Sequence, residues 1–193
     1  RVLVAKGQMR GQQGSVGSWQ AKAVELYGAL REDFPGVPAY SGALANKWGD
    51  VGAPDEFVEE GKKHLIRTTS RMRNSEDVKS AVKSWYGCTI ASNQGFEMLP
   101  RNDGYHYPKG SWPHQMSILA WGTFKGQEYF GILNQWGDVH GQLKYFHDGS
   151  PWPRGTLRVR REVVERMVTS GEAFAFSRFD GFPAQSFTFK NVI

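Results

Sequence analysis

Two stretches decide the fold of this chain: His114-Gln115-Met116-Ser117-Ile118-Leu119-Ala120-Trp121-Gly122 and Asn134-Gln135-Trp136-Gly137. The first stretch forms most of one predicted β-strand, and the second directly follows an apolar run at 129–133, which forms the next. Residues 123–127 join these two strands by a short turn. The histidine opens one strand and the asparagine ends the other, and in an antiparallel hairpin these two ends lie close together. An asparagine side-chain oxygen can accept a hydrogen bond from an imidazole N–H. The hairpin therefore predicts the orienting half of a catalytic triad.

The hairpin resembles that of the papain-like cysteine peptidases, in which a histidine strand is followed by an Asn-Ser-Trp-Gly segment. His114 and Asn134-Gln135-Trp136-Gly137 stand at those places here, with Gln135 as a departure from the serine of the family. The resemblance implies an α+β fold with a helical N-terminal half, an antiparallel β-rich C-terminal half and a cleft between them. It also implies that Trp136 shields the His–Asn hydrogen bond from water, which strengthens that bond.

The composition indicates a single folded domain over residues 1–193. The chain is 39% hydrophobic and 13% aromatic, which excludes wholesale disorder. Helical patterns dominate the first half and strand patterns the second, so we expect a helical subdomain over about 1–86 and a β-rich subdomain over about 87–193. No apolar run approaches the roughly 20 residues that span a bilayer, and no signal peptide is recognised. Many secreted proteins similar to papain carry disulfides, whereas this chain has a single cysteine, so the resemblance favours a cytoplasmic or virion-associated protein over a secreted one.

The local patterns predict the following elements. Helices are expected at 19–31, 55–64 and 75–85, the last with Ser75 as its N-cap, and residues 33–55 are interpreted as turns. Strands are expected at 88–91, 115–122, 128–133, 143–146, 156–159 and 173–177. Residues 162–167 are expected to form a helical turn, and residues 93–96 a loop that leads to the histidine strand.

The nucleophile position is where the sequence departs from the family. A papain-like site needs a thiolate at the start of a helix, and a glutamine a few residues earlier whose amide stabilises the oxyanion. Met9-Arg10-Gly11-Gln12 resembles the family's stretch before the turn, and Ser18-Trp19 stands where Cys-Trp belongs, six residues after Gln12. The resemblance therefore implies Ser18 at the nucleophile position, Gln12 at the oxyanion position and Trp19 in a supporting place.

Two other registers of this segment remain open. Counting from Gln13 matches the glycine- and serine-rich turn better but puts Trp19 at the nucleophile position, and Ser15 is a third candidate. A serine at this place is either an engineered replacement for cysteine or natural. A hydroxyl is far less acidic than a thiol, so no standing ion pair with His114 can form. We expect the chain as written to be inactive or very slow.

Cys88 is the only cysteine of the chain, so no internal disulfide can form. It follows a predicted helix end and starts an apolar strand, which favours a buried structural thiol over a nucleophile. Asp138, His140, His147 and Asp148 do not show the repeated spacing that is typical of metal ligands, so we expect no metal and no cofactor. The basic cluster Arg154, Arg158, Arg160, Arg161 and Arg166 is interpreted as a solvated face, and no nucleic-acid or membrane partner is expected.

The sequence thus predicts a papain-like cysteine-type peptidase that acts on a peptide, isopeptide or protein substrate, without activity as written. The alternative is a catalytically degenerate papain-like module that binds or supports other proteins, for example in a phage particle or another larger assembly. The missing cysteine favours this alternative, whereas the retained Gln12, His114, Asn134 and Trp136 favour the peptidase. A third interpretation is a transglutaminase-like cleft, or a cleft that cuts cell-wall peptides, because such sites depend on the same kind of catalytic triad.

Overall fold

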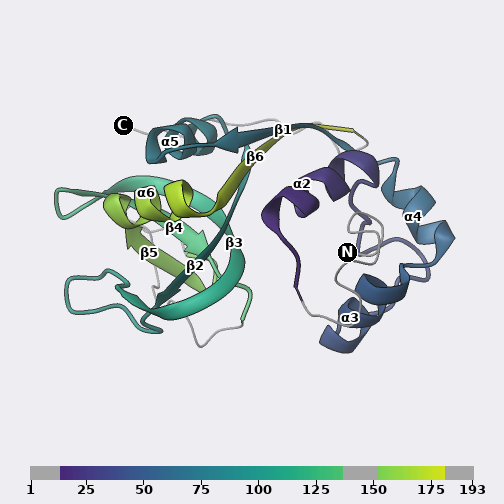
Figure 1. Cartoon of the computed structure of the whole chain (residues 1–193), viewed down its shortest axis with the longest axis horizontal. Coiled ribbons are helices and arrows are strands. Elements are labelled where there is room, and N and C mark those ends of the chain that lie inside the picture. The colour runs from purple at the N-terminus through teal and green to yellow at the C-terminus, as the bar shows by residue number, and fades with distance from the viewer. Residues whose placement is uncertain (1–13, 137–151, 181–193) are drawn as a thin grey trace.

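The computed structural model describes residues 14–136 and 152–180, and these ranges form helices on either side of a curved antiparallel sheet (Figure 1). The helices are α2 (Gly17–Leu26), α3 (Gly42–Val51), α4 (Asp55–Gly61), α5 (Ser75–Lys83) and α6 (Arg161–Ser170). The strands are β1 (Ile66–Met72), β2 (Gly87–Phe96), β3 (Pro108–Phe124), β4 (Gln127–Leu133), β5 (Thr156–Arg160) and β6 (Glu172–Phe179). The predicted α+β class is confirmed.

The sheet has six strands in the order β1-β6-β2-β3-β4-β5, and every neighbouring pair is antiparallel. Apolar side chains of the sheet meet those of α5 and α6 in one core. The fully buried members of this core include Val78, Ile90, Phe130, Leu157 and Val164. Burial of this apolar surface is the main stabilising contribution to the β-rich part of the fold.

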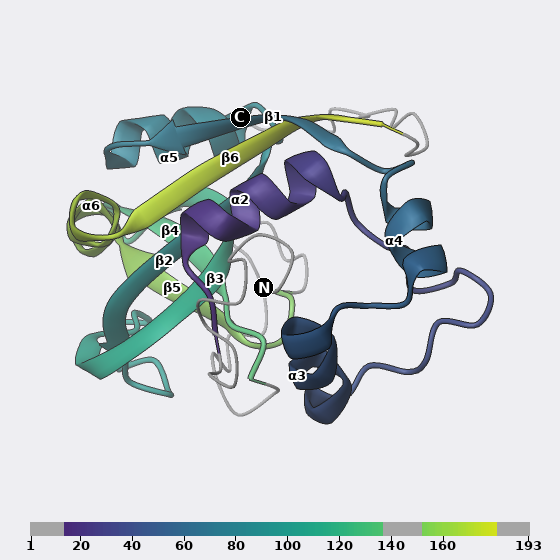
Figure 2. The same cartoon turned by 45° about the vertical axis from the view of Figure 1, so that its right-hand side comes forward.

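The helical part of the chain lies beyond α2, which packs against β1, β2 and β6. Figure 2 shows α2 between the sheet and the pair α3 and α4. Phe57 of α4 is buried, with its ring 5.6 Å from that of Trp48 in α3 and 6.2 Å from that of Phe34. This aromatic group joins α3, α4 and the preceding loop into one unit.

α2 ends at Leu26, five residues before the predicted end at Arg31, because the chain turns at Gly28. Gly28 has a φ of +68°, and a Cβ at this position would lie 1.9 Å from the carbonyl oxygen of Gly61. The next residue, Ala29, donates its backbone N–H to the carbonyl oxygen of His64 over 3.1 Å. Only glycine fits this close crossing, which fastens the end of α2 to the end of α4.

Two elements of the first half were not predicted. Residues 42–51 form α3, although they were interpreted as part of a turn region, and the Ser41 side chain caps this helix by accepting from Leu44 N–H at 3.1 Å. Residues 66–72 form β1, which pairs with β6 and makes the first strand of the sheet. β1 thus joins the sheet from a place before residue 86, and the division of the chain into two subdomains remains a prediction.

Several predicted boundaries also differ from the structure. The N-cap of α5 is Asn74 rather than Ser75, since the Asn74 side chain accepts from Asp77 N–H over 2.9 Å. Residues 93–96, predicted as a loop, belong to β2, and the predicted turn at 162–167 belongs to the ten-residue helix α6. The expected strand at 143–146 lies outside the described residues. None of the helices in the described ranges has the length and apolarity needed to cross a membrane.

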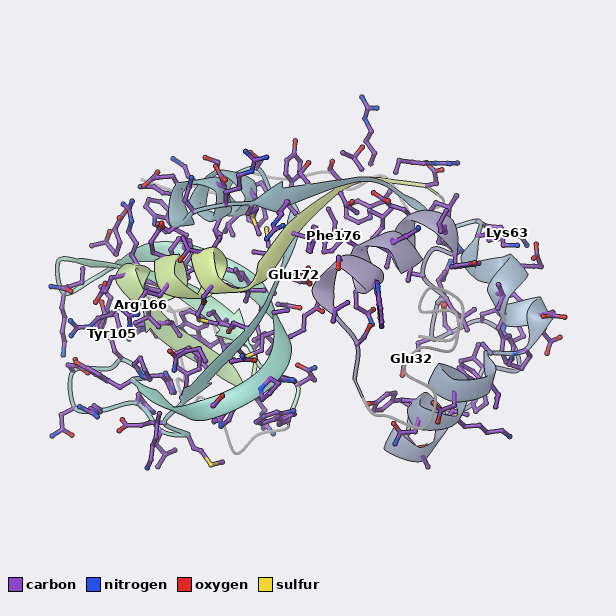
Figure 3. All side chains as sticks on the ribbon, in the orientation of Figure 1. Glu32, Lys63, Tyr105, Arg166, Glu172 and Phe176 are labelled. Carbon is purple, nitrogen blue, oxygen red and sulfur yellow. The ribbon has the colours of Figure 1, made fainter. Side chains whose placement is uncertain are left out.

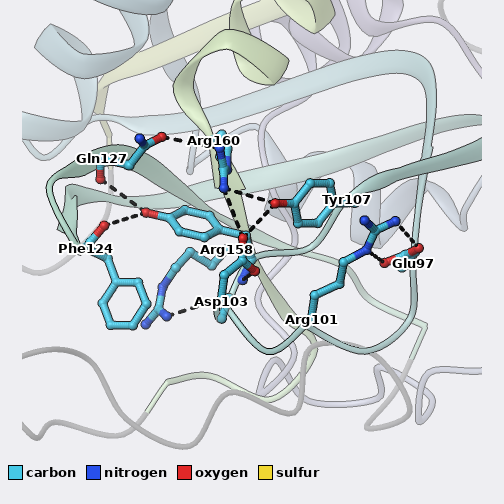
Figure 4. A network of polar contacts seen from close by, with 10 residues as sticks. Glu97, Arg101, Asp103, Tyr107, Phe124, Gln127, Arg158 and Arg160 are labelled. Carbon is cyan, nitrogen blue, oxygen red and sulfur yellow. Dashed lines mark hydrogen bonds and ion pairs between the residues drawn. The ribbon is translucent and has the colours of Figure 1, made fainter.

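The predicted solvated basic face is wrong for Arg158, which is buried, whereas Arg160 and Arg161 are partly exposed and form ion pairs. Arg158 is only 5% exposed, and its guanidinium lies 3.8 Å from the ring centre of Phe124. Arg160 donates to the Asp103 carboxylate over 3.0 Å, within the polar network of Figure 4, and Arg161 pairs with carboxylates on α5 and β4. These cations fix the loop between β2 and β3 and the ends of the sheet.

Candidate active site

The His–Asn pair forms at the end of the hairpin of β3 and β4. Nε2 of His114 and Oδ1 of Asn134 are 3.1 Å apart. An amide oxygen only accepts hydrogen bonds, so Nε2 is the protonated nitrogen and donates to it. Asn134 is 1% exposed, and its backbone N–H donates to the carbonyl oxygen of Gly155 at 3.1 Å, which holds the residue in place. The asparagine thus fixes the orientation of the imidazole, and Nδ1 is the ring nitrogen that takes no part in this bond.

Trp136 covers one face of the histidine ring. The two ring centres are 4.4 Å apart with an angle of 32° between their planes, and the ring of Trp112 lies 5.0 Å from that of Trp136. Trp136 itself is 46% exposed, so the indole stands between the imidazole and solvent. This is the contact that the predicted shielding of the His114–Asn134 bond requires; the catalytic role of the three residues remains a prediction.

A cleft of about 1360 Å³ separates the helical part from the sheet. Its walls come from the segment that leads into α2, from α3 and the loop before it, and from β2, β3 and β6. Residues that line it include Ser15, Gln20, Tyr40, Ser92, His114 and Glu172. The imidazole of the hairpin therefore faces an open groove large enough for several residues of an extended chain.

The N-terminus of α2 lies at this cleft and already holds an anion. The backbone N–H of Ser18 donates to Oε2 of Glu172 over 2.9 Å, whereas the N-cap residue Val16 makes no side-chain hydrogen bond. Gly17 is buried, and a Cβ there would lie 2.8 Å from the same carboxylate oxygen. Glu172 therefore places its negative charge at the positive end of the helix dipole.

The predicted nucleophile segment is only partly brought to the cleft. Ser15 lines the cleft, whereas Ser18 is exposed, does not line it and has its backbone N–H engaged by Glu172. Trp19 is half-buried on α2. Gln12, the predicted oxyanion residue, lies outside the described residues. The choice among Ser15, Ser18 and Trp19 for the nucleophile register therefore remains a prediction.

Cys88 lies in the core of the sheet. Its neighbours on the adjacent strands are Ile118 and Ala175, and it is 4% exposed. Burial raises the pKa of its thiol to about 12, and Sγ donates to the carbonyl oxygen of Tyr86 at 3.4 Å. The interpretation as a buried structural thiol is confirmed, and no thiolate forms there at neutral pH.

Glu172 is one of the cleft residues that the sequence analysis did not single out. It directly precedes the strand expected at 173–177, and no local pattern marks a glutamate that meets a helix 154 positions away. The four residues considered as metal ligands, Asp138, His140, His147 and Asp148, lie outside the described residues. Within residues 14–136 and 152–180, no three His, Cys, Asp or Glu side chains gather in a way that could hold a metal ion.

Comparisons with known proteins show the fold. No family model and no curated protein sequence matches the chain. Among solved structures, xylellain, a cysteine protease from Xylella fastidiosa, is similar with a TM-score of 0.60 and 15% identity, over 91% of this chain and 66% of that one. The proCathepsin B S9 of Trypanosoma congolense is similar with a TM-score of 0.55 and 14% identity, over 91% and 58%.

A digestive procathepsin L 3 from the larval midgut of Tenebrio molitor is similar with a TM-score of 0.54 and 14% identity, over 86% of this chain and 49% of that one. The chain thus spans between about half and two thirds of the length of the structures it matches. The fold is that of the papain-like cysteine proteases, as the hairpin resemblance predicted.

Proposed function

We propose that this papain-like domain binds an extended peptide or protein segment in its cleft and does not cleave it by thiol chemistry. The proposal depends on one observation: the only cysteine of the chain is buried on β2 within the sheet core, away from the cleft that His114 lines. A thiolate nucleophile is what the chemistry of the fold's proteases requires, and a buried thiol with a pKa of about 12 does not supply it.

The cleft retains features that suit peptide binding. Strand β2 borders it through Ala91, Ser92 and Asn93, and the pairing of β2 with β3 shifts register between Ser92 and Gln94. Such a shift leaves backbone groups out of the ladder, where an extended ligand can use them. Tyr40, which is 81% exposed, adds an aromatic surface on the opposite wall. Together these features provide both backbone and side-chain contacts for a bound chain.

Peptide hydrolysis through a serine is the second candidate, and the His114–Asn134 hydrogen bond favours it. A histidine oriented in this way can act as a general base toward a serine hydroxyl, as in other triads. Against it, the Ser18 N–H that would help to stabilise an oxyanion is engaged by Glu172. If Ser18 replaces a cysteine by engineering, the parent protein would be a thiol peptidase with the same cleft.

A matched pair of variants on α2 tests the binding proposal. Gln20 and Lys22 are both exposed on this helix, but only Gln20 lines the cleft. A random octapeptide library is selected on the immobilised protein, and the enriched peptides are measured by fluorescence anisotropy. We expect Gln20→Trp to fill the cleft and weaken binding at least tenfold, while Lys22→Trp leaves it within twofold. Equal loss in both variants, or no enrichment on the wild-type protein, would refute the proposal.

A further inference from the structure

The described lining of the cleft is acidic, although the chain as a whole is basic. The net charge is +5, from 24 basic and 19 acidic residues. Among the described residues that line the cleft, the acidic ones are Glu32 and Glu172, and none is a lysine or an arginine. Figure 3 shows Glu172 on the sheet side, beside the start of α2, and Glu32 across from it on the segment before α3. The two walls therefore present the same sign of charge to a ligand.

Several carboxylates elsewhere in the described ranges pair with basic side chains. Glu128 pairs with Lys79 and Arg161 at 2.7 and 2.6 Å, and Glu97 pairs with Arg101 at 2.7 Å. Glu172 instead accepts only from a backbone N–H, and neither it nor Glu32 has a cationic partner within the described parts of the chain. Among the described residues that line the cleft, these two carboxylates can therefore pair with a cation from outside.

The position of the Glu172 carboxylate is fixed before any ligand arrives. Oε2 is held by the Ser18 N–H, and the missing Cβ of Gly17 lets the side chain lie against the helix. A carboxylate has about four acceptor positions on its two oxygens, so Oε1 can still accept from a guanidinium or ammonium group. A fixed acceptor in a half-buried place loses little side-chain entropy when a ligand binds.

We infer that the cleft selects peptides that carry an arginine or lysine side chain, with Glu172 as the main specificity-determining residue and Glu32 as a second contact. This inference rests on the proposed binding of peptides in the cleft. The cationic side chain pairs with Glu172 across the cleft from Tyr40, and the acidic walls also favour the approach of positively charged chains. Peptides with acidic side chains at the same position are disfavoured by repulsion.

The test compares peptides that differ only in charge. Enriched octapeptides are synthesised with arginine or with its neutral isostere citrulline, and their dissociation constants are measured on the wild-type protein, Glu172→Gln and Glu32→Gln. In Glu172→Gln the amide oxygen of the new side chain can still accept from the Ser18 N–H, so this variant removes the charge and keeps the contact. Glu56→Gln, on the exposed start of α4 outside the cleft, serves as the matched control.

We expect the wild-type protein and Glu56→Gln to prefer the arginine peptide by about twofold to fivefold, the contribution of a partly exposed ion pair. Glu172→Gln should abolish most of this preference, and added salt at about 0.5 M should reduce it in the wild-type protein. Equal binding of both peptides to the wild-type protein would overturn the inference and leave the proposed function standing. Failure of every peptide to bind would overturn both.

Discussion

The carboxylate of Glu172 accepts a hydrogen bond from the backbone N–H of Ser18 over 2.9 Å, which joins the first strand residue of β6 to the first turn of α2. A helix N-terminus with unengaged N–H groups at this cleft would stabilise a negatively charged group of a ligand, or a negative charge that develops during a reaction. Here the protein supplies that anion itself. A Cβ at Gly17 would press against this same Glu172 side chain, and the engaged Ser18 N–H leaves the start of α2 with little to offer an oxyanion.

A cysteine introduced at position 18 tests this relationship through its reactivity. Ser18→Cys should react with iodoacetamide at neutral pH no faster than free cysteine, because the Glu172 carboxylate opposes the thiolate. Ser18→Cys combined with Glu172→Gln should react about tenfold faster, since removing one like charge lowers the thiol pKa by about one unit. Mass spectrometry gives both rates. Equal rates in the single and double variants would show that Glu172 does not control this end of the helix.

Substituting Gly17 tests the steric side of the same contact. Gly17→Ala should lower the free energy of unfolding by about 1–2 kcal/mol because its Cβ meets the Glu172 side chain. In a Glu172→Ala background the cost should shrink by about 1 kcal/mol, as expected for coupled neighbours. Gly42 is the matched control: it opens α3 as Gly17 opens α2, and a Cβ there meets nothing within 4 Å. Urea unfolding that gives equal costs for both alanines would contradict the contact.

Removing the asparagine of the hairpin should affect stability as well as the histidine. Asn134→Ala should lower the free energy of unfolding by about 1–3 kcal/mol, because the variant lacks the hydrogen bond to His114 and leaves a cavity at a buried position. The neighbouring Gln135→Ala should change the free energy by less than about 0.5 kcal/mol, since Gln135 is exposed. Urea denaturation of the two variants measures this difference, and similar values would mean that the His–Asn bond is unimportant to the fold.

The buried thiol predicts a specific dependence of stability on alkaline pH. Cys88 has a pKa of about 12 when folded against an ordinary value of 9.0, so between these values the folded state binds more protons than the unfolded state. The free energy of unfolding therefore falls as the pH rises above about 9. At about pH 10 the loss relative to about pH 8 should be about 1 kcal/mol larger in the wild-type protein than in Cys88→Ala. Parallel pH profiles for the two proteins would contradict the burial of this thiol.

The elements that sequence reasoning found are those with a local signal. His114 and Asn134 are close because one short turn joins their strands, and the apolar runs of β3 and β4 mark that hairpin in the sequence. α5 was found because acidic residues fill its first turn. Each of these features depends on residues near one another in the chain, so spacing and residue type suffice to predict them.

The elements that were missed depend on distant partners. β1 is rich in polar residues and becomes a strand because β6, more than a hundred positions later, provides its hydrogen bonds. α3 contains two glycines that lower helix propensity, so the Ser41 cap and the contact of Trp48 with Phe57 have to stabilise it. Glu172 reaches the cleft only when the sheet is assembled, and no spacing in the sequence indicates that place.

The most direct test of the central claim follows the mass of a bound peptide. A cleft-binding octapeptide is incubated overnight with an equal concentration of the protein, in parallel with the His114→Ala variant, and intact masses are recorded. We predict that the peptide remains whole in both samples while anisotropy shows it bound to the wild-type protein. Cleavage at a single peptide bond by the wild-type protein, lost in His114→Ala, would contradict the account and establish a peptidase instead.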